Sequence, residues 1–305
     1  MKQIIRYILI WIKETDKIYL LLVSLLTAVI IYLNYGFGFS NWILHLPVPF
    51  PRFTGLYFLF LLCFGGSYLL YFIRNKHNFL KHGGFIILLF AAPAIFALKM
   101  SVTPKFHLGF NTYWNHYFNK VVYWPTLFIM LTTILLITWV YQKNKESFYG
   151  LTFKNVDWKP FLLMLFIMIP AIAVVSMKSD FLQTYPKLKM VLPFSGSAEN
   201  KWFYASIFEF SYGIDFLTVE LFFRGFLVFA FLRYAGKNVI LPMACFYCAI
   251  HFGKPIVECI SSFFGGILLG IIAYNTRSII GGIMLHVGMA WLMEIGGYLG
   301  NVLKE

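Results

Sequence analysis

Residues 203–235 read FYASIFEFSYGIDFLTVELFFRGFLVFAFLRYA, an apolar segment that carries two charges in the motif Val219-Glu220-Leu221-Phe222-Phe223-Arg224. An ionised side chain at bilayer depth costs roughly 2.5–3.5 kcal/mol on insertion scales, so such groups normally face a partner or a cavity. Glu220 and Arg224 are four residues apart, which places both on one face of an α-helix and within reach of an ion pair. The segment therefore indicates a membrane helix with a polar side, although a purely structural ion pair would explain the motif as well.

The rest of the chain has the same apolar character. Of its 305 residues, 60% are hydrophobic, 20% are aromatic and only 12% are charged, and the mean hydropathy is +0.75. This composition excludes a water-soluble globule and predicts an all-α, polytopic integral membrane bundle. Because a span takes about 20 apolar residues, the chain has room for about eight or nine transmembrane helices. We expect them near residues 18–34, 54–73, 84–98, 121–141, 160–177, 203–235, 239–252, 256–275 and 278–300.

The net charge of +13 is distributed over many loops. Attraction to anionic lipid headgroups explains this distribution better than nucleic-acid binding, so membrane lipids are the expected partners and nucleic acid is not. Residues 1–17 alternate lysine and arginine with isoleucine and leucine, which predicts an amphipathic interfacial segment rather than a cleaved signal. The lysine and arginine clusters favour a cytoplasmic N-terminus. The four cysteines lie in apolar runs, where they imply no disulfide framework.

The character of the chain changes near residue 150. Residues 1–150 contain almost no ionisable group in the middle of a span, and they are expected to form a membrane scaffold. Residues 151–305 are expected to form a core that carries the polar motifs. The later spans contain carboxylates and histidines, and their many glycines, Gly281-Gly282 among them, would allow close helix packing around a polar centre.

Two histidines in this second part, His251 and His286, fall in two different predicted helices that follow the helix of Glu220. One intramembrane histidine is usually a packed, hydrogen-bonded residue. Two of them, together with Glu220 on a third helix, suit either metal binding or general acid–base chemistry on a water molecule. No His-Glu-x-x-His zinc signature, Gly-x-Ser-x-Gly elbow or phosphate-binding loop occurs in the chain.

Three motifs in this region resemble those of the CPBP family, the CAAX prenyl protease 2-like and bacteriocin-processing (Abi) membrane proteins. They are Glu220 to Gly225, Tyr247 to His251, and Ser278 to His286. The resemblance implies a helical membrane bundle, in bacteria a multi-pass protein of the cytoplasmic membrane, whose active cavity hydrolyses peptide bonds. In the family, a first glutamate and the second-motif histidine are thought to activate water, while the third-motif histidine and a following asparagine hold the oxyanion.

The chain departs from the family pattern at two positions. Val219 replaces the first of two adjacent glutamates, and Ala290 replaces the asparagine four residues after His286. Two other carboxylates could compensate. Asp215 lies one helical turn before Val219, and Glu258 lies seven residues after His251. Asp215 could equally be a helix-start or interface residue, and Glu258 could simply pair with Lys254.

The leading interpretation is a membrane endopeptidase of the CAAX protease type, a metalloprotease-like hydrolase acting on a peptide or membrane-protein substrate. His251 would activate water, His286 would stabilise the oxyanion, and Glu220 with Arg224 would form a supporting ion pair. Zinc or another divalent metal is compatible with these groups, but the pattern implies no metal site. The alternative is a non-catalytic protein on the same scaffold that binds a peptide or partner in an immunity or maturation role, because of Val219 and Ala290.

Overall fold

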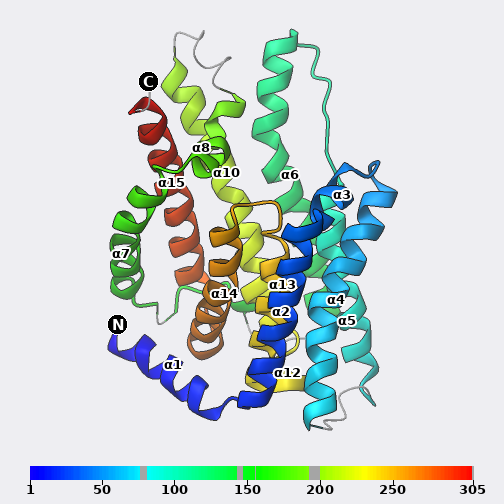
Figure 1. The fold of residues 1–305 in the computed structure, drawn as a ribbon. Coiled ribbons are helices and arrows are strands. Elements are labelled where there is room, and N and C mark those ends of the chain that lie inside the picture. Colours follow the sequence, from blue (N-terminus) through cyan, green and yellow to red (C-terminus); the bar gives the residue numbers. More distant parts are fainter. Residues whose placement is uncertain (76–80, 143–146, 155, 192–199, 304–305) are drawn as a thin grey trace. The chain divides into compact units, whose positions relative to one another are not determined.

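The computed structural model describes residues 1–75, 81–142, 147–154, 156–191 and 200–303, and within these ranges the chain is helical, without a β-strand (Figure 1). Six helices among the described residues are long and apolar enough to cross a membrane. The prediction of a polytopic helical membrane bundle is confirmed, although the number of spans is not the expected eight or nine. The six are α2 (Lys17–Phe37), α4 (Phe50–Asn75), α5 (Gly83–Ser101), α6 (Thr112–Tyr141), α14 (Ile256–Thr276) and α15 (Ile280–Val302).

Three of the nine expected spans are not among these six helices. The span expected over 160–177 is observed as the shorter apolar helix α7 (Lys159–Val175), which has 17 residues. The segment expected as one helix over 203–235 is divided into α10 (Lys201–Glu220), a π-helical turn η4 (Leu221–Phe226) and the short helices α11 (Leu227–Phe229) and α12 (Leu232–Ala235). The segment expected over 239–252 contains α13 (Ile240–Ala249), which has only ten residues. Every residue of α13 is buried by protein, so its apolar sequence reflects a protein core rather than contact with lipid.

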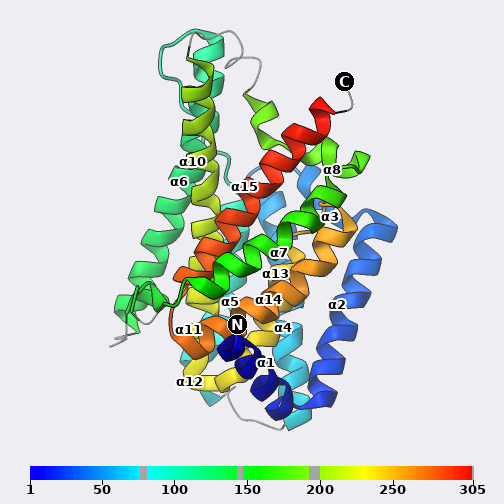
Figure 2. The ribbon, with the colours of Figure 1, turned by 90° about the vertical axis from the view of Figure 1, so that its left-hand side faces the viewer.

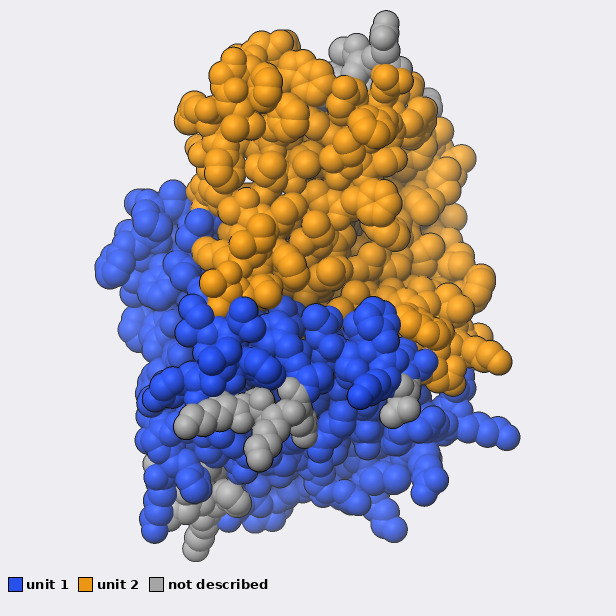
Figure 3. All heavy atoms as spheres, turned by 180° about the vertical axis from the view of Figure 1, so that it is seen from behind, with its two compact units in different colours: residues 1–102, 134–156, 221–280 blue, residues 103–133, 157–220, 281–305 orange. Residues whose placement is uncertain are grey.

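The chain forms two compact units (Figure 3). Unit 1 comprises residues 1–102, 134–156 and 221–280, and unit 2 comprises residues 103–133, 157–220 and 281–305. Each unit thus draws on distant parts of the sequence. The division of the sequence at residue 150 concerns composition rather than these units and stays a prediction.

In unit 1, α13 packs against α4 and α14, and α4 packs against α5. Aromatic rings fill the space between them, with Phe246 of α13 in contact with Phe60 and Phe64 of α4 at centroid distances of 4.8 and 5.7 Å. Asp16 caps the N-terminus of α2, and its carboxylate accepts hydrogen bonds from the backbone amides of Ile18 and Tyr19. Unit 1 also contains α3 (Phe39–His45), η2 (Phe148–Gly150) and η5 (Gly236–Val239).

The first helix, α1 (Lys2–Glu14), is strongly amphipathic and lies crosswise at one end of unit 1, below α2 and α14 in Figures 1 and 2. It buries Ile4 and Trp11, and Glu14 at its end forms an ion pair of 2.7 Å with Lys237. The amphipathic helix expected within residues 1–17 is thus observed, and its location at the membrane interface stays a prediction.

Unit 2 is built around α10 and α15, accompanied by most of α6, α7 (Lys159–Val175), α8 (Ser179–Thr184) and η3 (Lys187–Met190). Glycines of α15 let other segments of the protein approach this helix closely. A Cβ atom added at Gly288 would lie 2.7 Å from the side chain of Leu165 on α7, and one at Gly300 would meet the backbone oxygen of Ser176 at 2.4 Å. The expected role of glycines in tight helix packing is observed on this helix.

Candidate functional site

A direct polar contact joins two of the candidate site residues, Glu220 and His286, in unit 2. Glu220 ends α10 and is completely buried, and its Oε1 lies 2.9 Å from Nδ1 of His286 on α15. A carboxylate accepts hydrogen bonds, so the proton of this contact belongs to Nδ1 when the imidazole is neutral. The lone pair of the ring is then on Nε2.

Gly282 makes this contact sterically feasible. It lies four residues before His286 and therefore on the same face of α15. A Cβ atom at position 282 would be 2.5 Å from Oε2 of Glu220, closer than real Cβ contacts. The ring of Phe216, one turn before Glu220 on α10, covers the imidazole at a centroid distance of 4.8 Å. The buried carboxylate thus lies beside a glycine and a histidine, and the ring of that histidine packs on Phe216.

The second histidine, His251, lies in unit 1 and follows α13 rather than lying within it. Its Nδ1 is 2.9 Å from the backbone oxygen of Tyr247, which as an acceptor again assigns the proton to Nδ1. The side chain is almost buried, with 7% exposed. The expectation that His251 lies inside a helix over 239–252 is wrong because α13 ends at Ala249 and a turn closed by His251 N and Cys248 O follows.

Arg224 and Tyr247 form a second buried contact in unit 1. The guanidinium carbon lies 3.9 Å from the centre of the Tyr247 ring, and Arg224 is only 1% exposed. The same ring meets the His251 imidazole edge to face at 4.7 Å. Tyr247 therefore contacts the arginine of the first motif and the histidine of the second, while the ion pair expected between Glu220 and Arg224 stays a prediction.

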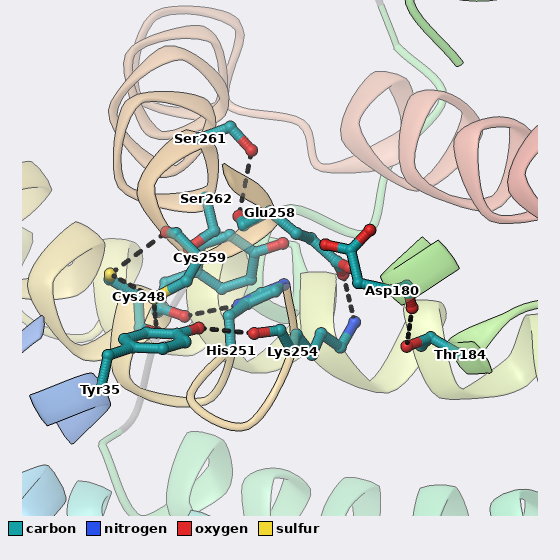
Figure 4. Close-up of polar contacts among 11 residues, drawn as sticks. Tyr35, Asp180, Thr184, Cys248, His251, Lys254, Glu258, Cys259, Ser261 and Ser262 are labelled. Atoms are coloured by element: carbon teal, nitrogen blue, oxygen red, sulfur yellow. Dashed lines mark hydrogen bonds and ion pairs between the residues drawn. The ribbon is translucent and has the colours of Figure 1, made fainter. Parts of the chain in front are cut away.

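Glu258, in the first turn of α14 (Ile256–Thr276), has a partner in the turn that precedes this helix. Its Oε1 lies 2.6 Å from Nζ of Lys254, as expected for the simple ion pair considered from the sequence (Figure 4). The backbone oxygen of Lys254 accepts a hydrogen bond of 2.6 Å from Tyr35, which ties this turn to α2. Cys248 and Cys259, with sulfur atoms 3.7 Å apart, are buried beside it as free thiols, as is expected for cysteines in apolar runs.

The remaining candidates lie in unit 2. Asp215 is half-buried on α10. Val219 and Ala290, the two departures from the family pattern, are buried with 6% and 3% of their surfaces exposed. Neither side chain can donate or accept a hydrogen bond. Valine and alanine therefore cannot do the work of the glutamate and the asparagine that the family pattern has at these two positions.

No group of three or more histidine, cysteine, aspartate or glutamate side chains close enough to hold a metal ion occurs in the part of the chain that the structure describes. Glu220 and His286 supply two donor groups, fewer than the three protein ligands of a typical catalytic zinc site. These two residues alone do not fit a zinc ion.

Two contributors were not identified as site residues from the sequence. Gly282 was recognised only as one of many packing glycines, although its spacing of four from His286 placed it on the histidine face. Tyr247 was named only as the first residue of the second motif, because neither its backbone oxygen nor the stacking of its ring on Arg224 leaves a sequence signal.

Comparison with known proteins supports the resemblance. Residues 202–292 match the family model described as Type II CAAX prenyl endopeptidase Rce1-like. This match contains α10, α13, α14 and the first half of α15, and so all four proposed site residues. No curated protein and no solved structure matches the chain.

Proposed function

From the Rce1-like character of residues 202–292 in an integral membrane protein, we propose that this chain is an intramembrane endopeptidase of the CAAX protease type. The observation that carries the proposal is the 2.9 Å contact between the buried Glu220 carboxylate and Nδ1 of His286. A base whose ring is oriented by a third group is the arrangement that enzymes use to move protons during acyl transfer. The expected substrate is a peptide or membrane protein, and the expected location is a bacterial cytoplasmic membrane.

In this proposal, Nε2 of His286 accepts a proton from water while the water oxygen attacks the peptide carbonyl carbon. The Glu220 carboxylate stabilises the imidazolium that forms, because the two charges are adjacent and shielded from solvent. The imidazolium then returns the proton to the leaving nitrogen as the C–N bond breaks, giving a carboxylic acid, which keeps the second proton of the water, and an amine. This assigns acid–base work to His286, which the resemblance assigned to the oxyanion.

His251 is the second imidazole of the proposed mechanism. Its Nδ1 proton is directed to the Tyr247 oxygen, which presents Nε2 in one tautomer to a water molecule or to the developing oxyanion. Arg224, stacked on the Tyr247 ring, would supply positive charge near the same residue. Asp215 is the candidate for the missing carboxylate, whereas the Lys254 ion pair makes Glu258 the weaker of the two.

The second candidate function is a non-catalytic binding protein on the same scaffold. The buried apolar side chains of Val219 and Ala290 support it, since they remove one carboxylate and one amide from the family pattern. Such a protein would hold a peptide or partner helix in the membrane without cleaving it.

Cleavage of a membrane-peptide library by the purified protein in liposomes, followed by mass spectrometry, tests the proposal. His286→Ala and His251→Ala should abolish cleavage, and Glu220→Gln, which keeps the shape and removes the charge, should reduce its rate by about 10²- to 10⁴-fold. Asp157→Asn, a change of an exposed carboxylate outside the matched region, is the control and should cleave normally. If the parent cleaves nothing and Val219→Glu with Ala290→Asn restores cleavage, the non-catalytic function is correct.

A further inference from the structure

Unit 2 contains a cavity of about 450 Å³ whose lining includes neither Glu220 nor His286, and no residue of the three motifs described from the sequence. It lies between α10 and α15, which are neighbours in both ribbon views (Figures 1 and 2), and η3 closes part of it. Its volume is that of a site for a small organic molecule. Its walls are mostly aromatic and aliphatic side chains, chiefly Leu188, Trp202, Phe210, Trp291, Ile295 and Tyr298.

Two carboxyl groups interrupt this apolar lining, Glu209 from α10 and Glu294 from α15. Glu209 lies eleven residues before Glu220, and Glu294 lies eight residues after His286. At 1.5 Å per residue these spacings correspond to roughly 16 and 12 Å along the two helices. The carboxyl pair is therefore a second polar contact between the same two helices, about two to three turns from the proposed acid–base residues.

Glu294 is held in place by the backbone. Its two carboxylate oxygens accept hydrogen bonds from Lys187 N at 2.7 Å and Leu188 N at 3.1 Å, and the residue is 6% exposed. Two amide donors stabilise the ionised form of a carboxylate. Glu294 is thus held in one orientation in the wall of the cavity.

Glu209 is the unexplained member of the pair. Its side chain interacts directly with that of Glu294, and its Oε2 is buried without a hydrogen-bond donor in the described part of the chain. The indole of Trp291 reaches only the backbone oxygen of Glu209, at 3.4 Å. Two carboxyl groups in contact in an apolar wall repel each other unless a proton or a cation lies between them.

We propose that this cavity binds a small apolar amine, a hydrophobic or aromatic body that carries one protonated amino group. An ammonium has three N–H donors and no acceptor, so it can donate to Glu209 and Glu294 together. The aromatic walls bury the apolar body, and the indole and phenol rings also attract a cation. Trp202, Phe210 and Tyr298 line the cavity and are also exposed at the protein surface. A ligand can therefore enter the cavity without opening the protein core.

Binding of three compounds with one body and different head groups tests this proposal: 4-phenylbutylamine, 4-phenylbutanol and 4-phenylbutyrate. Isothermal titration with the purified full-length protein in detergent at pH 7 should give the tightest binding for the amine, by at least about tenfold over the alcohol, and the weakest for the acid. Glu209→Gln should remove the preference for the amine. Ser206→Trp, which fills the cavity from α10, should weaken binding of all three compounds.

Asp157→Asn is the matched control, because it neutralises an exposed carboxylate of unit 2 away from the cavity, and it should bind like the parent. Equal affinity for amine and alcohol would overturn the proposal, as would an amine preference that persists in Glu209→Gln. Absence of binding by the folded parent would mean that the two carboxyl groups only share a proton. None of these outcomes depends on peptidase activity, so the two proposals fail separately.

Discussion

His251 and His286 are fixed through the same ring nitrogen, Nδ1, but by acceptors of different charge. His251 is held by a neutral backbone oxygen and His286 by a carboxylate. A carboxylate partner stabilises the imidazolium far more than a carbonyl does, so a proton acquired during catalysis should reside on His286. At the residue scale, this difference is the reason for assigning acid–base chemistry to His286 and an orienting role to His251.

Replacing Gly282 tests the space beside Glu220. Gly282→Ala places a methyl group 2.5 Å from Oε2 of Glu220, and because the helix backbone is rigid, the carboxylate must move away from His286. We expect a loss of about 1–3 kcal/mol in the free energy of unfolding, the usual cost of overpacking. Thermal denaturation of the purified protein measures it.

Gly265→Ala is the matched control, since nothing lies within 4 Å of a Cβ atom at that helical position. Alanine there should leave stability unchanged or raise it by about 0.5–1 kcal/mol through its better helix propensity. Equal stability of the two variants would contradict the close approach of Glu220 to α15.

Tyr247 is expected to hold Arg224 through its ring and His251 through its backbone oxygen. Substitutions of the side chain can remove the first contact and keep the second. Tyr247→Leu removes the ring beneath Arg224 and should cost about 2 kcal/mol, as for a desolvated cation–π contact. Tyr247→Phe keeps the ring and should lose much less. Both variants retain the backbone oxygen that orients His251. Denaturation midpoints of the two proteins measure the difference, and identical losses would argue against the stacking.

At the element scale, the junction of α10 with η4 changes the geometry of the first motif. The expected pairing of Glu220 with Arg224 assumed α-helical spacing, in which residues four apart share a face. Residues Leu221–Phe226 are π-helical, and a wider turn rotates the following side chains relative to an α-helix. π-Helical turns are frequent at functional sites, and this one carries the arginine of the motif.

The first turn of α14 provides a test of Glu258. Its ion pair with Lys254 is partly exposed and lies at the helix N-terminus, where a carboxylate is also stabilised by the helix dipole. We expect Glu258→Gln to cost at most about 0.5 kcal/mol and to change the cleavage rate less than about twofold. Lys254→Gln should have the same small effect on stability. A more than tenfold loss of cleavage in Glu258→Gln alone would instead identify Glu258 as the missing catalytic carboxylate.

At the scale of the whole molecule, membrane crossing can be tested with the protein's own cysteines in place. All four native thiols are buried, so an introduced exposed cysteine is the first to react with a membrane-impermeant maleimide. Lys105→Cys and Lys154→Cys flank the membrane-spanning helix α6 and are exposed. In sealed vesicles the two should be labelled from opposite sides.

After solubilisation in detergent, both positions should react, which controls for local accessibility. If the N-terminus is cytoplasmic, as the charge distribution favours, and α2, α4 and α5 also cross, Lys154→Cys is labelled from the cytoplasmic side. Labelling of both positions from one side of intact vesicles would mean that α6 does not cross the membrane.

The sequence by itself determined the solvent, the fold class and the region of the site. Apolar runs of about 20 residues can satisfy their backbone hydrogen bonds in a bilayer only as helices, so α2, α4, α5, α14 and α15 could be located to within a few residues. The same argument failed for α13, because a helix buried in protein and a helix buried in lipid have the same composition. Charged residues in apolar runs identified Glu220, Arg224, His251 and His286 as candidates, since such residues require partners.

Only the tertiary structure decided which partners they have. Glu220 contacts His286, 66 residues away, because Gly282 leaves room for its carboxylate between α10 and α15. Arg224 stacks on Tyr247, and His251 is oriented by a backbone oxygen that every sequence possesses. The cavity between Glu209 and Glu294 likewise depends on how α10 and α15 pack. Helix spacing along the chain sets the face on which a side chain lies, whereas the packing of distant helices sets what that face meets.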